Sequence, residues 1–124
     1  MRGSETFFRA AENGNLNLQD DMAFARDVQT ALMAGMRSID ASAKDRGVKP
    51  DTATGPGKLG VLNDSALGNA AGGKMCRSAY IEAEFITNPQ VETVLISGPQ
   101  AVANRTKVMA AVATAIRKHM KAMP

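Results

Sequence analysis

The chain has 124 residues, enough for one hydrophobic core, and we expect a single domain over residues 1–124. Hydrophobic residues make up 44% and charged residues 22% of the chain, which excludes a disordered protein, and no apolar run reaches the roughly 18 residues of a membrane span. The formal net charge of +3 is mild, and Cys76, as the single cysteine, excludes a disulfide within the chain.

The N-terminal part predicts a strand and then a long helix. Residues 5–10 are β-prone, and Asn13-Gly14-Asn15 favours a turn after them. We expect the helix to begin near Asn17, because Asp20 and Asp21 stand in its first turn, where acidic side chains favour the positive helix end. Apolar residues then recur every three or four positions, which predicts one face packed on a core. They are Leu18, Met22, Ala25, Val28, Leu32, Met36 and Ile39.

The middle of the chain predicts turns, one short strand and a loop. Residues 45–50 are expected to end the helical region, because Gly47 suits a turn and Pro50 cannot continue a helix. The short apolar segment 59–62 is predicted to be a strand. Residues 63–74 consist mainly of Asn, Gly and Ala and favour a surface loop.

The segment from Ser78 to Pro89 combines an apolar strand with two acids. Its near-continuous apolar run is typical of a strand covered on both faces, as in a mostly parallel sheet. Glu82 and Glu84 interrupt this run two residues apart, so both side chains are expected on the same face. Carboxylates are almost never fully buried unless they are paired, bound to metal or used in chemistry. Glu82 is therefore the first candidate for a functional group in this chain.

A second interpretation of this strand stays open beside the first. The strand can be an edge, with Glu82 and Glu84 simply solvated on its open face. Asn88 followed by Pro89 predicts a helix start directly after the strand, and functional groups of open α/β sheets gather where strands end and helices begin. This junction favours a functional role for Glu82.

Two helices are expected to close the chain. A short one runs from Pro89 to about Ile96, and residues 97–99 separate it from a final helix over 102–122. Basic residues on the final helix are expected to form its solvated face, since no aromatic residues alternate with them as in a nucleic-acid binder; we therefore expect no nucleic-acid partner. The predicted buried stripe of this helix is Val102, Met109, Val112, Ile116 and Met120.

Four sequence blocks, with an amphipathic helix after the first and a helix after the last, stand in an order that resembles one enzyme family. The blocks are Arg2-Gly3-Ser4-Glu5-Thr6-Phe7-Phe8, Asp45-Arg46-Gly47-Val48-Lys49, Leu59-Gly60-Val61-Leu62 and Ile81-Glu82-Ala83-Glu84-Phe85-Ile86-Thr87-Asn88-Pro89. Together they resemble the zinc-dependent N-acetylmuramoyl-L-alanine amidases over nearly the whole chain. The second and fourth blocks are the most specific parts of the resemblance.

The resemblance implies a fold and an activity. Those enzymes hydrolyse the amide between the lactyl group of muramic acid and the first alanine of the peptidoglycan stem. Glu82 matches their catalytic glutamate, which acts as general base and then general acid beside a zinc-bound water. The expected fold is α/β, with a small, mainly parallel sheet of about three strands flanked by two longer helices and one short helix. It would be an incomplete version of the family's larger three-layer fold.

Zinc is the implied cofactor, but this chain is not expected to ligate it. The family's ligands, two His and one Glu, all come from sequence that precedes the segment matching residues 2–8. His119 is expected to be solvated on a basic helix, and Cys76 alone cannot make a three-ligand site. We therefore expect the C-terminal part of an amidase catalytic domain, incomplete on its own as an enzyme. The alternatives are a non-catalytic peptidoglycan-binding or regulatory remnant and, outside the cell wall, a basic interaction module.

The expected partner is peptidoglycan. An incomplete sheet would also expose an edge, which predicts self-association or pairing with a complementary N-terminal segment. The cell wall or periplasm is the location that the resemblance implies, although the first 20 residues lack the apolar run of a secretory signal.

The sequence departs from the family pattern in three places. Glu84 stands where a small residue is usual, Arg77 replaces a frequent Pro, and the loop over 63–74 is longer.

Overall fold

The computed structural model describes residues 1–66 and 76–124, and within them it has a three-stranded sheet and two long helices. The strands are β1 (Ser4–Phe8), β2 (Asp45–Pro50) and β3 (Tyr80–Glu82). The helices are α1 (Leu18–Ile39), the single turn α2 (Pro89–Val91) and α3 (Ala101–Ala122). Two 3-10 turns, η1 (Asp51–Ala53) and η2 (Gly60–Asn63), follow β2, and a π-helical turn, η3 (Glu92–Ile96), continues α2.

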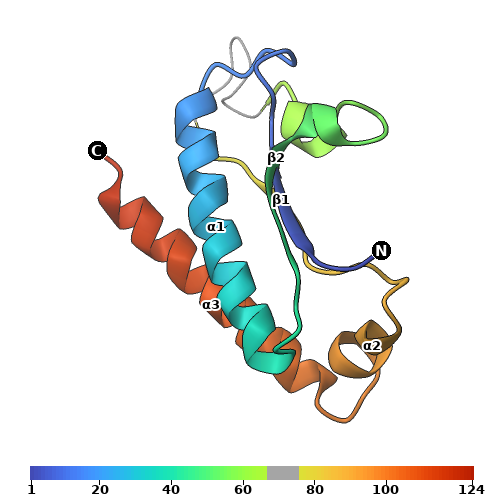
Figure 1. The fold of residues 1–124 in the computed structure, drawn as a ribbon. Coiled ribbons are helices and arrows are strands. Elements are labelled where there is room, and N and C mark those ends of the chain that lie inside the picture. Colours follow the sequence, from blue (N-terminus) through green and yellow to red (C-terminus); the bar gives the residue numbers. More distant parts are fainter. Residues whose placement is uncertain (67–75) are drawn as a thin grey trace.

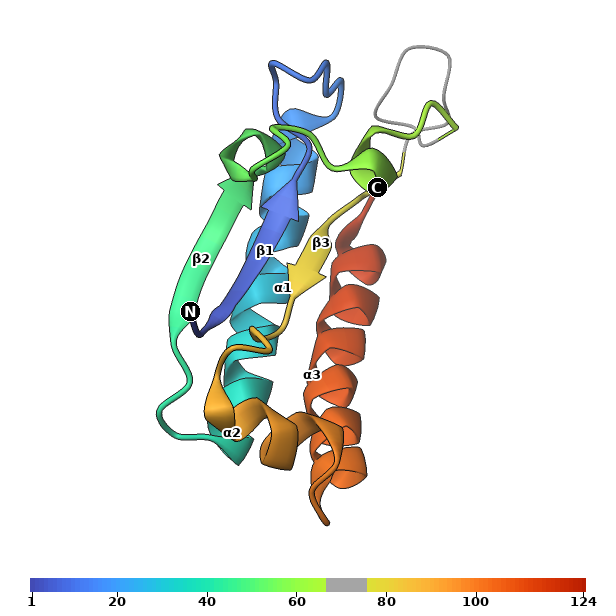
Figure 2. The ribbon, with the colours of Figure 1, turned by 90° about the vertical axis from the view of Figure 1, so that its right-hand side faces the viewer.

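The sheet has the order β2-β1-β3, with β1 in the middle (Figure 2). β1 pairs with β2 in parallel over five residue pairs and with β3 in antiparallel over three, so the longer pairing is parallel. A parallel pair needs a crossover connection, and α1 supplies it between β1 and β2. The predicted α/β class is confirmed.

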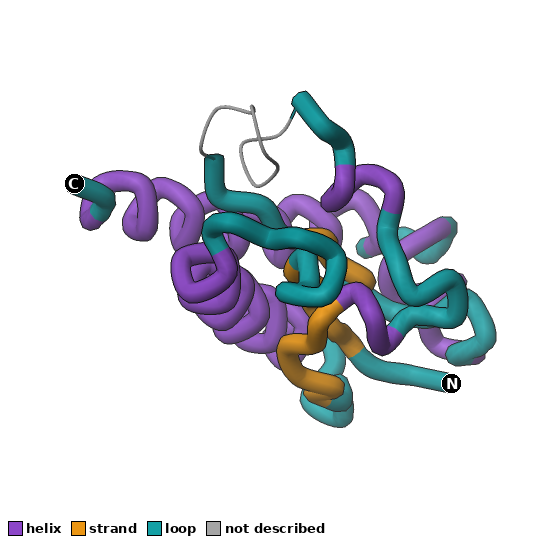
Figure 3. The backbone as a smooth tube through the Cα atoms, turned by 90° about the horizontal axis from the view of Figure 1, so that it is seen from above, coloured by secondary structure: helices purple, strands orange, loops and turns teal. Residues whose placement is uncertain are grey.

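Both long helices lie on one face of the sheet (Figures 1 and 3), and the shorter helical turns lie near the two ends of the strands (Figure 2). The core is formed where α1 and α3 pack together, with partly buried side chains such as Ile81 and Ala83 against it. Gly35 lets the two helices approach closely, because a Cβ at this position would lie 2.9 Å from the Cα of Val108. The fully buried members of the core are Val28, Leu32, Met33, Met36, Ala43, Val108 and Val112.

The predicted helices are confirmed, but two predictions for the middle of the chain are wrong. Residues 45–50 are the parallel strand β2 rather than a turn, because β1 offers a pairing edge that outweighs the turn preference of Gly47 and Pro50. The predicted strand over 59–62 is instead part of the 3-10 turn η2. Of the predicted loop over 63–74, residues 67–74 lie outside the described residues.

Two predictions about burial also need correction. The strand with the two acids is not the strand covered on both faces of the first interpretation but an edge strand, as in the second; it is β3, and it spans only Tyr80–Glu82. In α3, Val112 is buried as predicted, but Val102, Met109 and Met120 are 68%, 46% and 62% exposed. The helix instead turns Ala101 and Val108 inward, because the close contact at Gly35 decides which face meets α1.

Polar contacts join α1 to the sheet as well as apolar ones. Gln29 is 4% exposed, and its amide nitrogen donates to the backbone oxygen of Ser4 at 3.0 Å and to Asp45 Oδ1 at 2.6 Å. Its amide oxygen accepts a hydrogen bond from the hydroxyl of Thr6 at 2.7 Å. The buried amide is thus paired at both ends, and it holds α1 over the start of both β1 and β2.

Asp51 organises the loops at the other end of the strands. Its carboxylate is fully buried and accepts four hydrogen bonds at 2.7–3.2 Å, from two backbone N–H groups and two side-chain amides. Burial works to raise the pKa of Asp51, but these hydrogen bonds outweigh it and hold the pKa below its ordinary value. The donors are Ala10, Asn13, Leu59 and Asn63.

Replacing Asp51 by asparagine should destabilise the fold by about 2–4 kcal/mol, since an amide cannot accept at both ends and leaves buried donors unpaired. Because folding lowers the pKa of Asp51, its contribution is complete above the unfolded pKa and is lost as pH falls through the folded pKa. Urea unfolding across acid and neutral pH measures both effects. Asp64→Asn, at an exposed position, is the control and should change neither; equal effects of both variants would contradict the role of Asp51.

Candidate functional site

Two glutamates face each other across neighbouring strands. Glu5 of β1 stands directly opposite Glu82 of β3 in the antiparallel register. Their side chains point away from the helices, because the alternate residues Thr6 and Ile81 contact α1 or pack against the core. Glu5 is 4% exposed and Glu82 is partly buried. Like charges in such a pair repel unless other groups compensate them.

Two cations from β2 compensate Glu5. Arg46 donates from Nε to Glu5 Oε2 at 3.0 Å, and the ammonium of Lys49 binds the same oxygen. Arg46 is the extra residue of a β-bulge, because Ser4 pairs with Asp45 while Glu5 already pairs with Gly47. Gly47 has φ +80°, a conformation that glycine adopts without strain. The bulge is therefore what brings Arg46 to the carboxyl pair.

The surroundings separate the pKa values of the two carboxyl groups. Burial works to raise the pKa of Glu5, but Lys49 and Arg46 outweigh it and lower that pKa. Burial raises the pKa of Glu82, and both the charge of Glu5 and a hydrogen bond between the two carboxyl groups raise it further. One carboxyl group is thus held ionised while the other keeps its proton to higher pH. Such a separation of two acids is typical of sites that transfer protons.

Glu84 does not join this pair, although the alternation of a strand predicted it on the same face as Glu82. The chain leaves the sheet after Glu82, and Glu84 turns to the backbone. Its Oε1 accepts from the N–H groups of Gly3 at 2.5 Å and Phe85 at 2.9 Å, and its Oε2 accepts from the amide of Asn88 at 3.1 Å. Glu84 therefore fastens the segment after β3 to the start of the chain. Asn88 caps α2 as predicted, accepting from the N–H of Gln90 at 3.2 Å.

The other residues considered from the sequence lie elsewhere. His119 of α3 was predicted to be solvated, but its side chain is only 13% exposed. It contacts Asp27 of α1 at 2.7 Å, and its ring is tilted by 53° to the ring of Phe24. Arg77 pairs with Asp20 at 3.0 Å near the start of α1. Cys76 is partly buried next to the undescribed segment. In the described part of the chain, no three His, Cys, Asp or Glu side chains are grouped to hold a metal ion.

Three members of the site went unrecognised in the sequence. Glu5 has the same features that singled out Glu82, an acid within an apolar strand, since Thr6, Phe7 and Phe8 follow it directly. Arg46 and Lys49 belong to a segment that was predicted to be a turn, so their approach to Glu5 was not foreseen. Their signal was the presence of two cations, three residues apart, within the segment 45–50. This signal is informative only once the segment is known to pair with β1.

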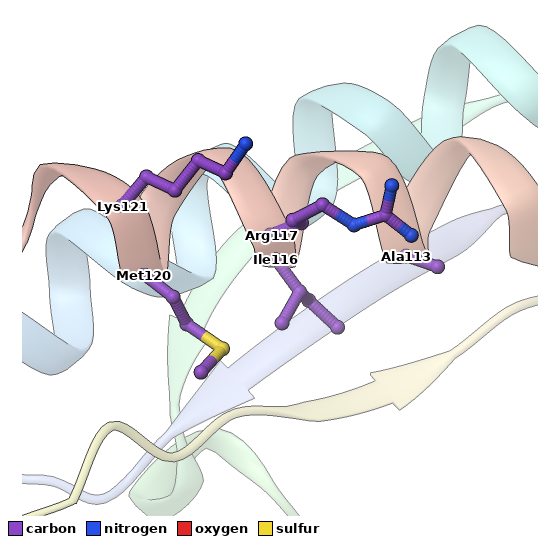
Figure 4. A pocket seen from close by; sticks show the side chains of 5 residues that line it. All are labelled: Ala113, Ile116, Arg117, Met120 and Lys121. Carbon is purple, nitrogen blue, oxygen red and sulfur yellow. The ribbon is translucent and has the colours of Figure 1, made fainter.

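A pocket of about 550 Å³ lies on α3, beside the strands (Figure 4). Ile116 and Met120 point from the helix to the side where the strands run, and Arg117 and Lys121 flank them. The lining has no carboxyl, imidazole or thiol group, so it offers no acid–base chemistry. We therefore place the candidate site at the Glu5–Glu82 pair.

Comparison of the chain with protein-family models, with curated proteins and with solved structures finds no match. None of the helices within residues 1–66 and 76–124 has both the length and the apolar character needed to cross a membrane.

Glu5→Gln should lower the pKa of Glu82, because it removes a neighbouring negative charge and leaves Arg46 and Lys49 to act on Glu82. A carboxyl-detected NMR titration of Glu82 measures the change. Glu12→Gln, at an exposed position, is the control. An unchanged titration of Glu82 in Glu5→Gln would show that the two carboxyl groups are not coupled.

Proposed function

We propose that this chain supplies the proton-transferring carboxyl group of a peptidoglycan hydrolase of the N-acetylmuramoyl-L-alanine amidase type. The observation that supports the proposal most is the position of Glu82 at a partly buried site with a raised pKa, next to a second carboxyl group. The resemblance of the sequence blocks names the same residue as catalytic. These two arguments are independent, because the pKa of Glu82 follows from contacts and not from the resemblance.

The proposed role of Glu82 is to move one proton twice. As a carboxylate it takes a proton from the attacking water, whose oxygen forms a bond to the carbonyl carbon of the lactyl amide. As a carboxylic acid it then gives that proton to the nitrogen of the alanine as the C–N bond breaks. A raised pKa suits both steps, because the group becomes a stronger base and still donates at higher pH. Burial raises the pKa of Glu82 most, and Glu5 adds to the shift.

The described residues do not fit zinc, although the resemblance implies it. A catalytic zinc takes three protein ligands and keeps one open position. Here Glu5 is already bound by Arg46 and Lys49, and no imidazole or thiol stands beside Glu82 among the described residues. The part assigned to this chain is therefore proton transfer by Glu82.

A second candidate function is non-catalytic binding or regulation at the cell wall. The observation that favours it is the same one: within residues 1–66 and 76–124, no three His, Cys, Asp or Glu side chains are grouped to hold a metal ion. In that case the Glu5–Glu82 pair would remain from a catalytic fold without its chemistry. Both candidates share peptidoglycan as the partner and the cell wall or periplasm as the place of action.

The edges of the sheet suggest that the chain also binds a second copy of itself or a complementary N-terminal segment. β2 and β3 are both edge strands among the described residues, and each presents unpaired backbone groups on its outer side. We expect self-association, or binding of a complementary N-terminal segment, along one of these edges. Static light scattering over a wide concentration range tests self-association, and a monomer at every concentration would contradict it.

Glu82→Gln should reduce amide hydrolysis by about 10²–10⁴-fold, because glutamine keeps the shape of the side chain and cannot transfer the proton. Because the chain is expected to be incomplete on its own, the assay supplies zinc and an N-terminal amidase segment that carries the zinc ligands. It incubates them with the chain and purified peptidoglycan and measures the alanine amino groups that hydrolysis releases. The pH profile should rise with ionisation of Glu82, at a pH above the ordinary glutamate value of 4.5. Glu12→Gln is the control and should keep full activity.

Sedimentation with insoluble peptidoglycan separates the two candidate functions. Binding with hydrolysis that depends on Glu82 supports the hydrolase. Binding without hydrolysis, even when the N-terminal zinc-ligand segment and zinc are supplied, supports the non-catalytic protein. If the chain neither binds nor cleaves peptidoglycan, both candidates are wrong.

A further inference from the structure

A second pocket lies next to the carboxyl pair and is lined in part by Arg46, one of the two cations that bind Glu5. This pocket has a volume of about 420 Å³, and Arg46, which donates to Glu5, forms part of its wall. It is lined by Met1, Arg2, Lys44, Arg46, Thr87, Asn88 and Pro89. Three of these residues are cations and none is an acid.

The three cations are incompletely paired. No carboxylate among the described residues lies within ion-pair distance of Lys44. Arg46 gives only its Nε to Glu5, so its two terminal nitrogens have no hydrogen-bond partner among the described residues. Arg2 binds Asp40 and Ser42 through one terminal nitrogen, while its buried Nε has no partner. The pocket therefore holds more donors and more positive charge than the chain itself satisfies.

The other polar groups of the pocket are already engaged. Thr87 Oγ1 exchanges hydrogen bonds with the backbone of Met1, and the side chain of Asn88 binds Glu84 and Gln90. Arg46 is also held in place by Phe85, whose ring centre lies 5.1 Å from the guanidinium carbon. A fixed guanidinium with free donors is suited to a planar carboxylate, which it binds through two parallel hydrogen bonds.

We propose that this pocket binds a carboxylate of the substrate's peptide portion, with Lys44 and Arg46 as its main contacts. This inference rests on the proposed function and extends it from the reacting amide to the specificity of the site. Arg46 connects the two places, because it donates to Glu5, which stands opposite Glu82, and lines the pocket together with Lys44. Binding a remote charged group in this way fixes the position of the amide relative to Glu82.

The test is an amide-detected NMR titration of the whole chain with N-acetyl-Ala-Glu, with its uncharged diamide and with inorganic phosphate. We expect the dicarboxylate to shift the signals of Lys44, Arg46 and Thr87 and the diamide to leave them unchanged. Lys44→Gln should weaken binding of the dicarboxylate about tenfold, the effect of one charge-assisted hydrogen bond. Lys58→Gln removes an exposed lysine outside the pocket and should leave binding unchanged. The same spectra show whether each variant is folded.

Arg46→Lys provides a second variant, which keeps the charge and removes the planar pair of donors. It should weaken the dicarboxylate more than phosphate, because lysine still binds a phosphate as a point charge. Tighter binding of phosphate than of the dicarboxylate by the unmodified chain would overturn the assignment to a peptide carboxylate. So would equal weakening by Lys44→Gln and Lys58→Gln, or no shift with either anion.

Failure here is distinguishable from failure of the proposed function. The titration needs no turnover, and the effect of Glu82→Gln is measured on intact peptidoglycan. Hydrolysis that depends on Glu82 without anion binding would refute the pocket alone. Anion binding that depends on Lys44 without hydrolysis would refute the catalytic role and retain the pocket.

Discussion

The burial of the Glu5 carboxylate in the central strand is the constraint that shapes this molecule. A carboxylate that is 4% exposed needs compensating charge, and the neighbouring strand β2 supplies it from Arg46 and Lys49. The bulge at Arg46, which depends on Gly47, exists where that compensation is needed. On the opposite side of β1, burial raises the pKa of Glu82, and the negative charge of Glu5 raises it further. The reactivity proposed for Glu82 thus depends on its burial and on a neighbouring carboxylate that stays ionised.

Arg46 connects the carboxyl pair to the cationic pocket, because its side chain contacts both Glu5 and the pocket. Its Nε serves Glu5, while its terminal nitrogens remain unpaired at the wall of the pocket. Arginine can bind in both places because its donor nitrogens are spread over a rigid plane, whereas the compact ammonium of a lysine would bind at only one place. Lys49 secures Glu5 independently of Arg46. The carboxylate of Glu5 therefore stays ionised even when a ligand engages part of the guanidinium.

Much of the fold can be predicted from local sequence patterns, and the predictions that were wrong share one cause. The buried stripe of α1 and the capped start of α2 were predictable, because spacing and capping act over a few residues. β2 was missed because its turn-forming Gly47 and Pro50 are overridden by pairing with β1, about 40 residues away in sequence. The inward face of α3 was missed for a similar reason. It depends on Gly35 in the other helix, which no periodicity within α3 reveals.

At the candidate site, too, the local sequence pattern predicts one part of the geometry, and contacts between distant parts of the chain determine the rest. The alternation of a strand treats Glu82 and Glu84 alike, but β3 ends between them, and only Glu82 stays in the sheet. What ends the strand is a set of contacts to the start of the chain, where Gly3 donates to Glu84 and Ser4 donates to the carbonyl of Ala83. These contacts bring Glu84 to the backbone and leave Glu82 opposite Glu5. The unusual acid at position 84 is thereby explained without a chemical role, since it holds Glu82 in register with Glu5, whose charge adds to the effect of burial on the pKa of Glu82.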